Sequence, residues 1–330
     1  MKPLAVTMGE PAGIGGDITL AAWRDRGRMD LPPFFVIDDP ARLERLARRL
    51  EIDAPVVPIR DPSEAAGVFA EALPVLAVEG RVSAGPGRPD PADAPLVIAA
   101  IERAVALCLE GGAAGVVTNP INKAELYRAG FTHPGHTEFI GHLCGGARAV
   151  MMLAGPSLRV VPATIHLPLA DAVRALKGGD LVAIGRIVLR TLRDDFGIDR
   201  PRLAFAGLNP HAGENGALGR EDIDIIAPAV AELARGGDSV VGPLPADTMF
   251  HAPARAEYDA AICMYHDQAL IPVKALDFDS AVNVTLGLPI VRTSPDHGTA
   301  FDIAGRGVAR PHSLISAIRL AGEIAGHRRG

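Results

Sequence analysis

Short apolar runs alternate with longer amphipathic segments along most of the chain. The runs, which are typical of buried β-strands, are residues 4–8, 34–37, 56–59, 114–118, 149–153, 158–165, 203–208, 260–265 and 281–286. The spacing of apolar residues predicts helices from about residue 18, at 41–50, at 95–109, from about 137, and at 169–176, 180–196, 221–234 and 311–325. This alternation predicts an α/β fold in which helices cover both faces of mostly parallel sheets.

Three histidines follow predicted strands in the same manner. His166, His211 and His266 each come directly after an apolar run or a short step beyond it. Ligands of open α/β sheets bind at the carboxyl ends of the strands, so the three imidazoles could converge on one metal ion. Three histidine ligands leave open coordination positions, as in a catalytic site, and suit zinc or another divalent transition metal. The alternative is that each histidine is a hydrogen-bonded loop residue.

Two carboxylates accompany the histidines. Asp267 directly follows His266, and Asp247 lies in the Pro-rich stretch 243–248. A carboxylate beside a liganding imidazole fixes its tautomer and raises its basicity, which predicts a supporting role for both acids. Solvated loop acids are the alternative reading.

Polar residues interrupt the apolar region after His266. Lys274, Asn283 and Arg292 stand among Val, Leu and Ile residues, and this pattern suits binding of a phosphate or carboxylate. An ordinary ion pair at a sheet end is the alternative. His136 and Thr137 begin a predicted helix, where side chains and backbone N–H groups can contact an anion.

Two stretches are rich in glycine. Residues 9–17 connect the first strand to a helix, and their glycines either expose N–H groups to an anion or allow close helix–strand packing. Their spacing also mimics the turn of short-chain dehydrogenases, but no tyrosine is followed four residues later by a lysine, which excludes that class. Residues 296–311 precede the last helix and predict a backbone-lined groove.

Composition narrows the class of protein. The chain has 330 residues, which exceeds the usual domain of about 100–200 residues and predicts two domains or one large one. A net charge of −6 without a long basic run argues against nucleic acid as a partner. The apolar runs are much shorter than the ~20 residues of a membrane span, and no signal peptide is recognisable, so we expect a cytoplasmic protein.

Several stretches resemble the 4-hydroxythreonine-4-phosphate dehydrogenase family of vitamin B6 biosynthesis. They cover nearly the whole chain in order and are residues 9–15, 134–139, 164–169, 207–214, 242–248, 264–268, 282–289 and 296–307. Residues 118–123 keep the expected Thr, Pro and Lys, whereas positions 119 and 122 vary in the family.

The resemblance implies roles for the candidate residues. His166, His211 and His266 would bind a divalent metal shared across a homodimer, zinc first, with magnesium or cobalt as alternatives. His136, Thr137, Lys274, Asn283 and Arg292 would bind the phosphorylated substrate, and Lys274 or Asp247 would act as general base. The family is similar in fold to isocitrate and isopropylmalate dehydrogenases, whose cofactor loop resembles 297–305. This likeness implies NAD or NADP at His297, Gly298, Thr299, Ala300 and Asp302.

The same resemblance implies an isopropylmalate dehydrogenase-like fold, with two α/β/α domains and an active-site cleft between them. The first domain would comprise residues 1–125 plus about 290–330 and carry the NAD loop. The second, about 126–289, would carry the metal and dimer contacts.

The expected reaction is NAD-dependent oxidation of 4-phosphohydroxy-L-threonine to 2-amino-3-oxo-4-(phosphooxy)butanoate, which decarboxylates to 3-amino-2-oxopropyl phosphate. A sister branch, which resembles the family in its metal-binding histidines, oxidises D-threonate or D-erythronate 4-phosphate and is the first alternative. A metal-dependent phosphate-ester hydrolase and a two-domain binding protein for an anionic ligand are the others.

Overall fold

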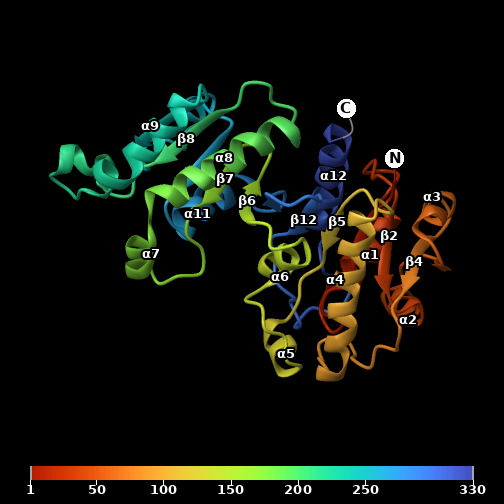
Figure 1. Cartoon of the computed structure of the whole chain (residues 1–330). Helices are drawn as coiled ribbons and strands as arrows, with labels where there is room; N and C mark the ends of the chain where they lie inside the picture. Colours follow the sequence, from red (N-terminus) through yellow and green to blue (C-terminus); the bar gives the residue numbers. More distant parts are fainter. Residues whose placement is uncertain (1, 329–330) are drawn as a thin grey trace. The chain divides into compact units, whose positions relative to one another are not determined.

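The computed structural model describes residues 2–328 and divides them between two compact units (Figure 1). Unit 1 comprises residues up to Ala149 together with those from Leu288 onward, and unit 2 comprises Val150–Gly287. The first boundary therefore lies beyond the expected residue 125. Phe131, Phe139 and Ile140 pack into the same apolar cluster as helix α4 (Ala94–Leu109), which keeps residues 126–149 in unit 1.

Unit 1 is built on six parallel strands in the order β3-β4-β2-β1-β5-β12. The strands are β1 (Leu4–Thr7), β2 (Phe34–Asp38), β3 (Val56–Ile59), β4 (Leu73–Ala77), β5 (Val116–Thr118) and β12 (Arg292–Pro295). The other helices are α1 (Gly15–Arg24), α2 (Pro40–Leu50), α3 (Ala65–Val68), α5 (Lys123–Arg128), α6 (His136–Leu143) and α12 (His312–His327), with 3-10 turns η1 (Pro62–Glu64) and η2 (Pro91–Asp93).

Helices bury both faces of this sheet. Ala5, Phe35 and Ile37 of β1 and β2 join the cluster under α4, whereas α12 packs on β12 and contacts α1. Because neighbouring residues along β1 and β2 are also buried, these strands read as continuous apolar runs instead of alternating ones. That is why their pattern was recognisable in the sequence.

Unit 2 has six strands in the order β11-β6-β7-β10-β8-β9. They are β6 (Val150–Ala154), β7 (Arg159–Pro162), β8 (Arg202–Ala206), β9 (Ser239–Leu244), β10 (Ala260–Cys263) and β11 (Val282–Leu286). The helices are α7 (Leu169–Ala175), α8 (Gly178–Asp194), α9 (Ala227–Arg235), α10 (Ala252–Arg255) and α11 (His266–Asp277), with the 3-10 segment η3 (Pro210–Gly216) and the π-helix η4 (Asp222–Ile226).

Strands β7, β10, β8 and β9 run parallel, while β6 is antiparallel to both β7 and β11. Strands β6 and β7 form a hairpin, in which the Gly155 N–H donates to the Leu158 carbonyl at 2.9 Å across the turn. Helix α11 covers one face of the sheet, and α8 and α9 pack together against β8 and β9.

The predicted α/β fold is confirmed, but several of the described elements were not predicted, among them β4, β9, β12 and α11. β4 and β9 contain Pro74 and Pro243, α11 contains Pro272, and β12 reads Arg-Thr-Ser-Pro. Proline and polar residues weaken the local signal for strand or helix. Burial in the sheet, which is set by the neighbouring elements, outweighs that signal.

Candidate functional site

The three candidate metal ligands follow adjacent parallel strands of unit 2. His166 lies four residues beyond β7, His266 begins α11 after β10, and His211 lies in η3 after β8. Since β10 pairs with both β7 and β8, the carboxyl ends of all three strands meet at one edge. The predicted placement at the strand ends is therefore present in the fold.

Two of the three imidazoles lie close together. The ring centroids of His166 and His266 are 5.9 Å apart, and both side chains line a cavity of about 330 Å³ that also includes Tyr265 and Asp267. The two loops are joined directly, since the Thr164 hydroxyl donates to the Met264 carbonyl at 2.8 Å. Within residues 2–328, no group of three His, Cys, Asp or Glu side chains is arranged so that it could hold a metal ion.

The backbone around His211 has an unusual conformation. Residues 211–215 all have positive φ, from 42° to 79°, and together make one left-handed turn. Four of the five are not glycine, and left-handed backbone costs such residues roughly 1–2 kcal/mol each. His166 also has positive φ, at 23°. Strain of this kind concentrates at functional sites, which supports a role for both loops.

Buried polar side chains hold these loops in place. Asp222, which is fully buried, accepts hydrogen bonds from the backbone N–H groups of Leu208 and Asn209 at 2.7 and 3.1 Å. Gln268 donates to the Gly207 carbonyl and accepts from the Met264 N–H, both at 2.7 Å, and so ties the strand ends of β8 and β10 together. Sequence reasoning missed both residues, because only burial distinguishes them from surface polar residues.

The candidate supporting acids differ in position. Asp267 Oδ1 lies 2.7 Å from His266 Nδ1, which leaves Nε2 of that ring for a ligand. Asp247 is exposed in the turn after β9. The side chains at this edge suit a divalent metal. A histidine follows each of three neighbouring strands, and Asp267 pairs with Nδ1 of His266, which is the nitrogen that would not bind the metal.

The candidate anion-binding residues divide between the units. Lys274 lies half-buried on α11 and Asn283 lies in β11, both in unit 2. His136 and Thr137 begin α6 of unit 1, where Arg292 opens β12 and is buried.

Positive charge surrounds His136. Burial lowers the pKa of His136 well below its usual range, and the charges of Arg292 and Lys123 lower it further. Burial also lowers the pKa of Arg292 to about 10, although Glu138 opposes that shift. Arg292 Nη2 donates to Thr118 Oγ1 at 2.7 Å, at the end of β5. Within residues 2–328, His136 Nε2 is buried without a hydrogen-bond partner, as expected of a group that contacts a ligand.

The candidate cofactor loop packs against the first glycine-rich turn. The Ile14 N–H donates to the Thr299 carbonyl at 3.0 Å, and a Cβ on Gly13 would come within 2.8 Å of that same oxygen. Gly13 therefore allows a close approach of the two loops. His297, half-buried, has its Nδ1 3.0 Å from the Gly298 carbonyl, while Ala300 has φ of 45° and Asp302 is exposed.

Positions 119 and 122, which were noted above as variable in the family, are occupied by asparagines with structural roles. Asn119 is buried and donates to the Thr7 carbonyl and the Thr19 hydroxyl, and Asn122 caps α5. The Asn119 amide nitrogen is thus engaged by the chain itself, whereas its Oδ1 is buried without a hydrogen-bond partner among residues 2–328.

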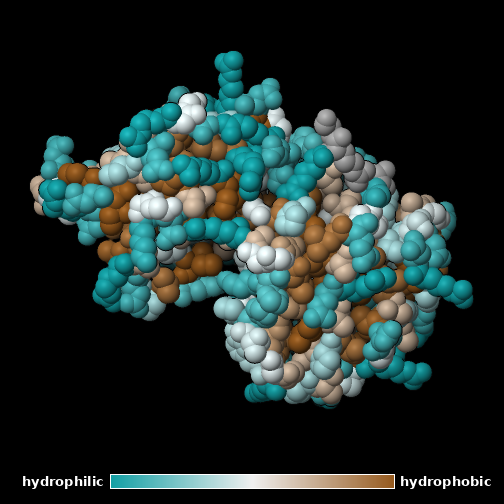
Figure 2. All heavy atoms as spheres, in the orientation of Figure 1, coloured by the Kyte–Doolittle hydropathy of each residue, from teal (hydrophilic) through white to brown (hydrophobic). Residues whose placement is uncertain are grey.

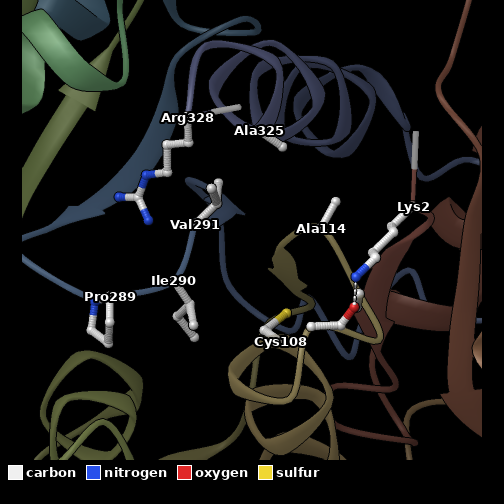
Figure 3. Close-up of a pocket in the computed structure, with 10 residues that line it drawn as sticks. Lys2, Cys108, Ala114, Pro289, Ile290, Val291, Ala325 and Arg328 are labelled. Carbon is white, nitrogen blue, oxygen red and sulfur yellow. Dashed lines mark hydrogen bonds between the residues drawn. The ribbon is translucent and has the colours of Figure 1, made fainter. Parts of the chain in front are cut away.

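A cavity in unit 1 lies at the amino ends of its strands (Figure 3). Lys2, Ala114 and Val291, which precede β1, β5 and β12, line this space of about 430 Å³. Burial raises the pKa of the Cys108 thiol there to about 12, and Lys2 donates to the Gly111 carbonyl. Since α/β sheets bind ligands at their carboxyl ends, this cavity is not the candidate site.

Known proteins resemble this chain over nearly its full length. A family model described as pyridoxal phosphate biosynthetic protein PdxA matches residues 30–321. A 4-hydroxythreonine-4-phosphate dehydrogenase of Bradyrhizobium diazoefficiens is 55% identical, covering 98% of this chain and 97% of its own, and one of Erythrobacter litoralis is 54% identical, covering 99% and 98%. The crystal structure of 4-hydroxythreonine-4-phosphate dehydrogenase from Klebsiella pneumoniae has a TM-score of 0.88 at 39% identity, covering 98% of this chain and 100% of that one.

Proposed function

Because the chain belongs to the PdxA family of pyridoxal phosphate biosynthetic proteins, we propose that it oxidises 4-phosphohydroxy-L-threonine with NAD. The product, 2-amino-3-oxo-4-(phosphooxy)butanoate, then loses CO2 to give 3-amino-2-oxopropyl phosphate. The observation that carries the proposal is the 55% identity, over nearly the full length, to a relative named for this dehydrogenase activity.

The substrate phosphate binds at the start of α6. His136 stays neutral because burial and neighbouring cations lower its pKa, so it donates a hydrogen bond without adding charge. Arg292 supplies the charge for a bidentate contact, and Thr137 supplies a hydroxyl and an N–H near the positive end of the helix. The resemblance also implies Lys274 and Asn283, which lie in unit 2, as substrate-binding residues, and that part of the set stays a prediction.

His166, His211 and His266 would hold a divalent metal, and zinc suits these nitrogen donors best. When bound, such an ion supplies Lewis-acid stabilisation of negative charge on the substrate oxygens. Asp267 orients His266 by pairing with Nδ1 at 2.7 Å, which keeps Nε2 directed to the ligand.

Oxidation removes the C3 hydrogen with its electron pair to the nicotinamide, while the C3 hydroxyl proton passes to a base. Lys274 is our first candidate, because it is half-buried on the same helix as His266, and Asp247 is the second. The resulting ketone accepts the electron pair of the breaking C–C bond, which is why the β-keto acid decarboxylates readily.

The cosubstrate binds along residues 297–302, with His297, Gly298, Thr299, Ala300 and Asp302 as its contacts. This loop contacts the glycine-rich turn, since the Ile14 N–H donates to the Thr299 carbonyl and Gly13 packs closely against the same oxygen.

A homodimer completes the proposed site. Unit 2 exposes large apolar side chains close to the metal-ligand candidates, namely Leu167 and Leu169 beside His166 and Ile271, Leu276 and Phe278 on or next to α11. Figure 2 shows brown, hydrophobic residues among the teal, hydrophilic residues of the face in view. Exposed apolar patches mark interaction surfaces, and a second copy would cover these residues.

NADH formation tests the function. Purified protein is incubated with NAD and 4-phosphohydroxy-L-threonine, D-threonate 4-phosphate or D-erythronate 4-phosphate, with and without a chelator, and absorbance is followed at about 340 nm. We expect turnover of the amino acid that the chelator abolishes and added zinc restores. Turnover of the sugar acids alone would move the chain to the sister branch.

Two further readouts separate the remaining alternatives. Release of inorganic phosphate without NAD would support a phosphate-ester hydrolase. Binding of the phosphorylated compounds without turnover under any cosubstrate would support a binding protein. Either result would overturn the dehydrogenase proposal.

A further inference from the structure

A basic pocket of unit 1 lies beside the candidate cofactor loop. It has a volume of about 470 Å³ and is enclosed by the first glycine-rich turn, one face of α2 and the segment 82–86. Arg42, Arg45 and Arg49, spaced by three and four residues, project from that face of the helix. None of the roles proposed above uses these side chains.

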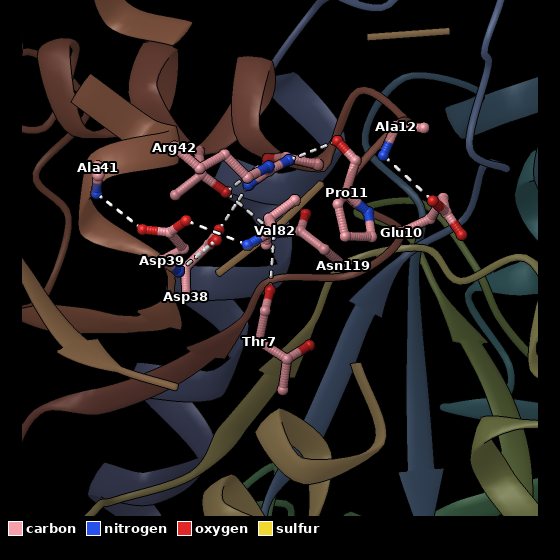
Figure 4. A network of polar contacts seen from close by, with 12 residues as sticks. Thr7, Glu10, Pro11, Ala12, Asp38, Asp39, Ala41, Arg42, Val82 and Asn119 are labelled. Atoms are coloured by element: carbon pink, nitrogen blue, oxygen red, sulfur yellow. Dashed lines mark hydrogen bonds and ion pairs between the residues drawn. The ribbon is translucent and has the colours of Figure 1, made fainter. Parts of the chain in front are cut away.

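The pocket wall is held rigidly by buried acids (Figure 4). Arg42 pairs with Asp38 at 2.7 Å and donates to the Pro11 carbonyl at the same distance. Asp39 accepts from the N–H groups of Ala41 at 2.9 Å and Val82 at 3.2 Å, which fixes segment 82–86 against α2. The guanidinium group of Arg42 is therefore occupied by contacts within the chain itself.

The other two arginines remain available to a ligand. Arg49 donates its Nε to the Gly305 carbonyl at 2.9 Å, so its two Nη groups are directed elsewhere. Arg45 is exposed, and among residues 2–328 its guanidinium has no hydrogen bond or ion pair. Two guanidinium groups one helical turn apart are suited to one phosphate.

A buried acceptor lines the same pocket. Asp17 is 4% exposed, and its Oδ1 accepts from the Gly305 N–H at 2.7 Å. Its Oδ2 is buried and has no hydrogen-bond partner within the described residues. A carboxylate oxygen in this position requires a donor such as a hydroxyl group, which a bare phosphate ion lacks.

The pocket adjoins the candidate cofactor loop through several contacts. A Cβ on Gly305 would lie 2.6 Å from Pro86, and one on Gly87 would lie 2.9 Å from the Phe301 carbonyl. Gly13, which lines the pocket, is packed against Thr299 on its other side. A dinucleotide lying along residues 297–302 can therefore extend one end into the pocket.

We propose that this pocket binds the phosphorylated adenosine ribose of NADP, with Arg45 and Arg49 on the 2′-phosphate and Asp17 Oδ2 on the ribose 3′-hydroxyl. The assignment rests on the proposed function, and it predicts that the dehydrogenase uses NADP as well as NAD. An arginine beside the ribose is the usual reader of a 2′-phosphate.

Binding of nucleotide fragments tests the assignment without turnover. Calorimetry compares adenosine 2′,5′-bisphosphate with 5′-AMP on the full-length wild type, Arg45→Ala and Arg48→Ala. Arg48 is the matched control, because it lies on the same helix, is not among the pocket's lining residues, and has only a 3.9 Å contact with Glu44. We expect Arg45→Ala to lower the affinity for adenosine 2′,5′-bisphosphate about tenfold and to leave the affinity for 5′-AMP unchanged. Arg48→Ala should bind both nucleotides as the wild type does.

A second variant tests the hydroxyl contact. Asp17→Asn keeps an acceptor for the Gly305 N–H but replaces Oδ2. Because both nucleotides carry the 3′-hydroxyl that Oδ2 would bind, the affinity for each should fall by a similar factor. Equal binding of both nucleotides by the wild type, or equal losses for both in Arg45→Ala, would overturn the assignment to the 2′-phosphate.

Steady-state kinetics separates this inference from the proposed function. With 4-phosphohydroxy-L-threonine, Arg45→Ala should raise KM for NADP about tenfold and leave KM for NAD unchanged. Turnover with NAD but no effect of Arg45→Ala on NADP would sink the pocket assignment and leave the dehydrogenase intact. Absence of turnover with either cosubstrate would sink the dehydrogenase, while the nucleotide-binding result would stand on its own.

Discussion

Individual buried charges set much of the electrostatics of unit 1. Arg42 and Asp38 are 6% and 1% exposed and form an ion pair at 2.7 Å. Asp38 ends the second strand, the position at which an acid binds the ribose in Rossmann folds, but here Arg42 engages it. This pairing agrees with the prediction that the cosubstrate does not bind as in a short-chain dehydrogenase.

Arg42→Ala should destabilise the protein by about 3–5 kcal/mol, because it leaves Asp38 as an unpaired buried charge. Urea unfolding followed by circular dichroism measures the loss. The control is Arg48→Ala, which removes an exposed charge from the same helix and should change the free energy of unfolding by less than about 0.5 kcal/mol. Equal losses in the two variants would contradict a structural role for the buried pair.

His136 should make the stability depend on pH. Its pKa is lowered on folding, so below the ordinary value of about 6.5 the unfolded chain binds a proton that the folded chain does not. Stability is therefore full above that pH and falls as the pH drops through it, by at most about 1.4 kcal/mol per pH unit.

His136→Asn should remove this dependence, so the difference in unfolding free energy between wild type and variant should shrink from pH 8 to pH 5. Chemical unfolding at a series of pH values measures it. The exposed His251→Asn controls for the loss of one imidazole. A difference that is constant with pH would show that His136 is not kept neutral by folding.

The segment from β8 to η4 is the element on which the proposed metal site depends most. It brings His211 to the strand edge through a left-handed turn, and Asp222 holds the start of that turn through three hydrogen bonds to Leu208 and Asn209. An acid that is fully buried in this way acts on the metal only through the position of the loop.

Asp222→Asn should lower zinc affinity about 10–100-fold, as is usual when the groups that orient a ligand are changed. It should also cost about 1–3 kcal/mol of stability, because buried N–H groups lose their acceptor. Calorimetric zinc titration and urea unfolding provide the two readouts. Asp224→Asn, two residues along in an exposed pair with Arg220, should alter neither. Unchanged zinc binding in Asp222→Asn would remove His211 from the proposed ligands.

For the molecule as a whole, the division into two units separates the proposed tasks. Unit 1 holds His136, Arg292 and the candidate cofactor loop, and unit 2 holds the three histidines and the exposed apolar residues of α11. No helix among residues 2–328 meets the length and apolarity that a membrane span requires. The cytoplasmic location stays a prediction.

Phe278→Asp should convert the proposed dimer to a monomer and lower zinc affinity, because Phe278 is 70% exposed beside the helix that begins with His266. Light scattering after size exclusion gives the oligomeric state. Val308→Asp, which replaces an apolar residue of unit 1 that is 58% exposed, should leave the dimer intact. A monomeric wild type would refute the shared site.

The pattern of apolar and polar residues was sufficient to predict those elements whose buried positions are occupied by apolar residues. Strands such as β1, β2 and β10 are apolar at nearly every position because helices cover both faces of each sheet, so the α/β class followed from the chain alone. The placement of three histidines after strands also followed, since parallel strands end at a common edge. Full-length resemblance to a known family supplied the substrate and the reaction.

Features that depend on distant partners had no local signal. Whether Asp222 or Gln268 is a surface residue or a buried support depends on loops that pack against it from elsewhere in the chain. The same holds for the pocket of Arg45 and Asp17, which is assembled from segments around residues 13, 45, 84 and 305. The spacing of apolar residues depends only on residues that are close in the sequence, so it can be read from the chain. Whether a polar group is buried and hydrogen-bonded depends on segments that are distant in the sequence, so only the tertiary structure determines it.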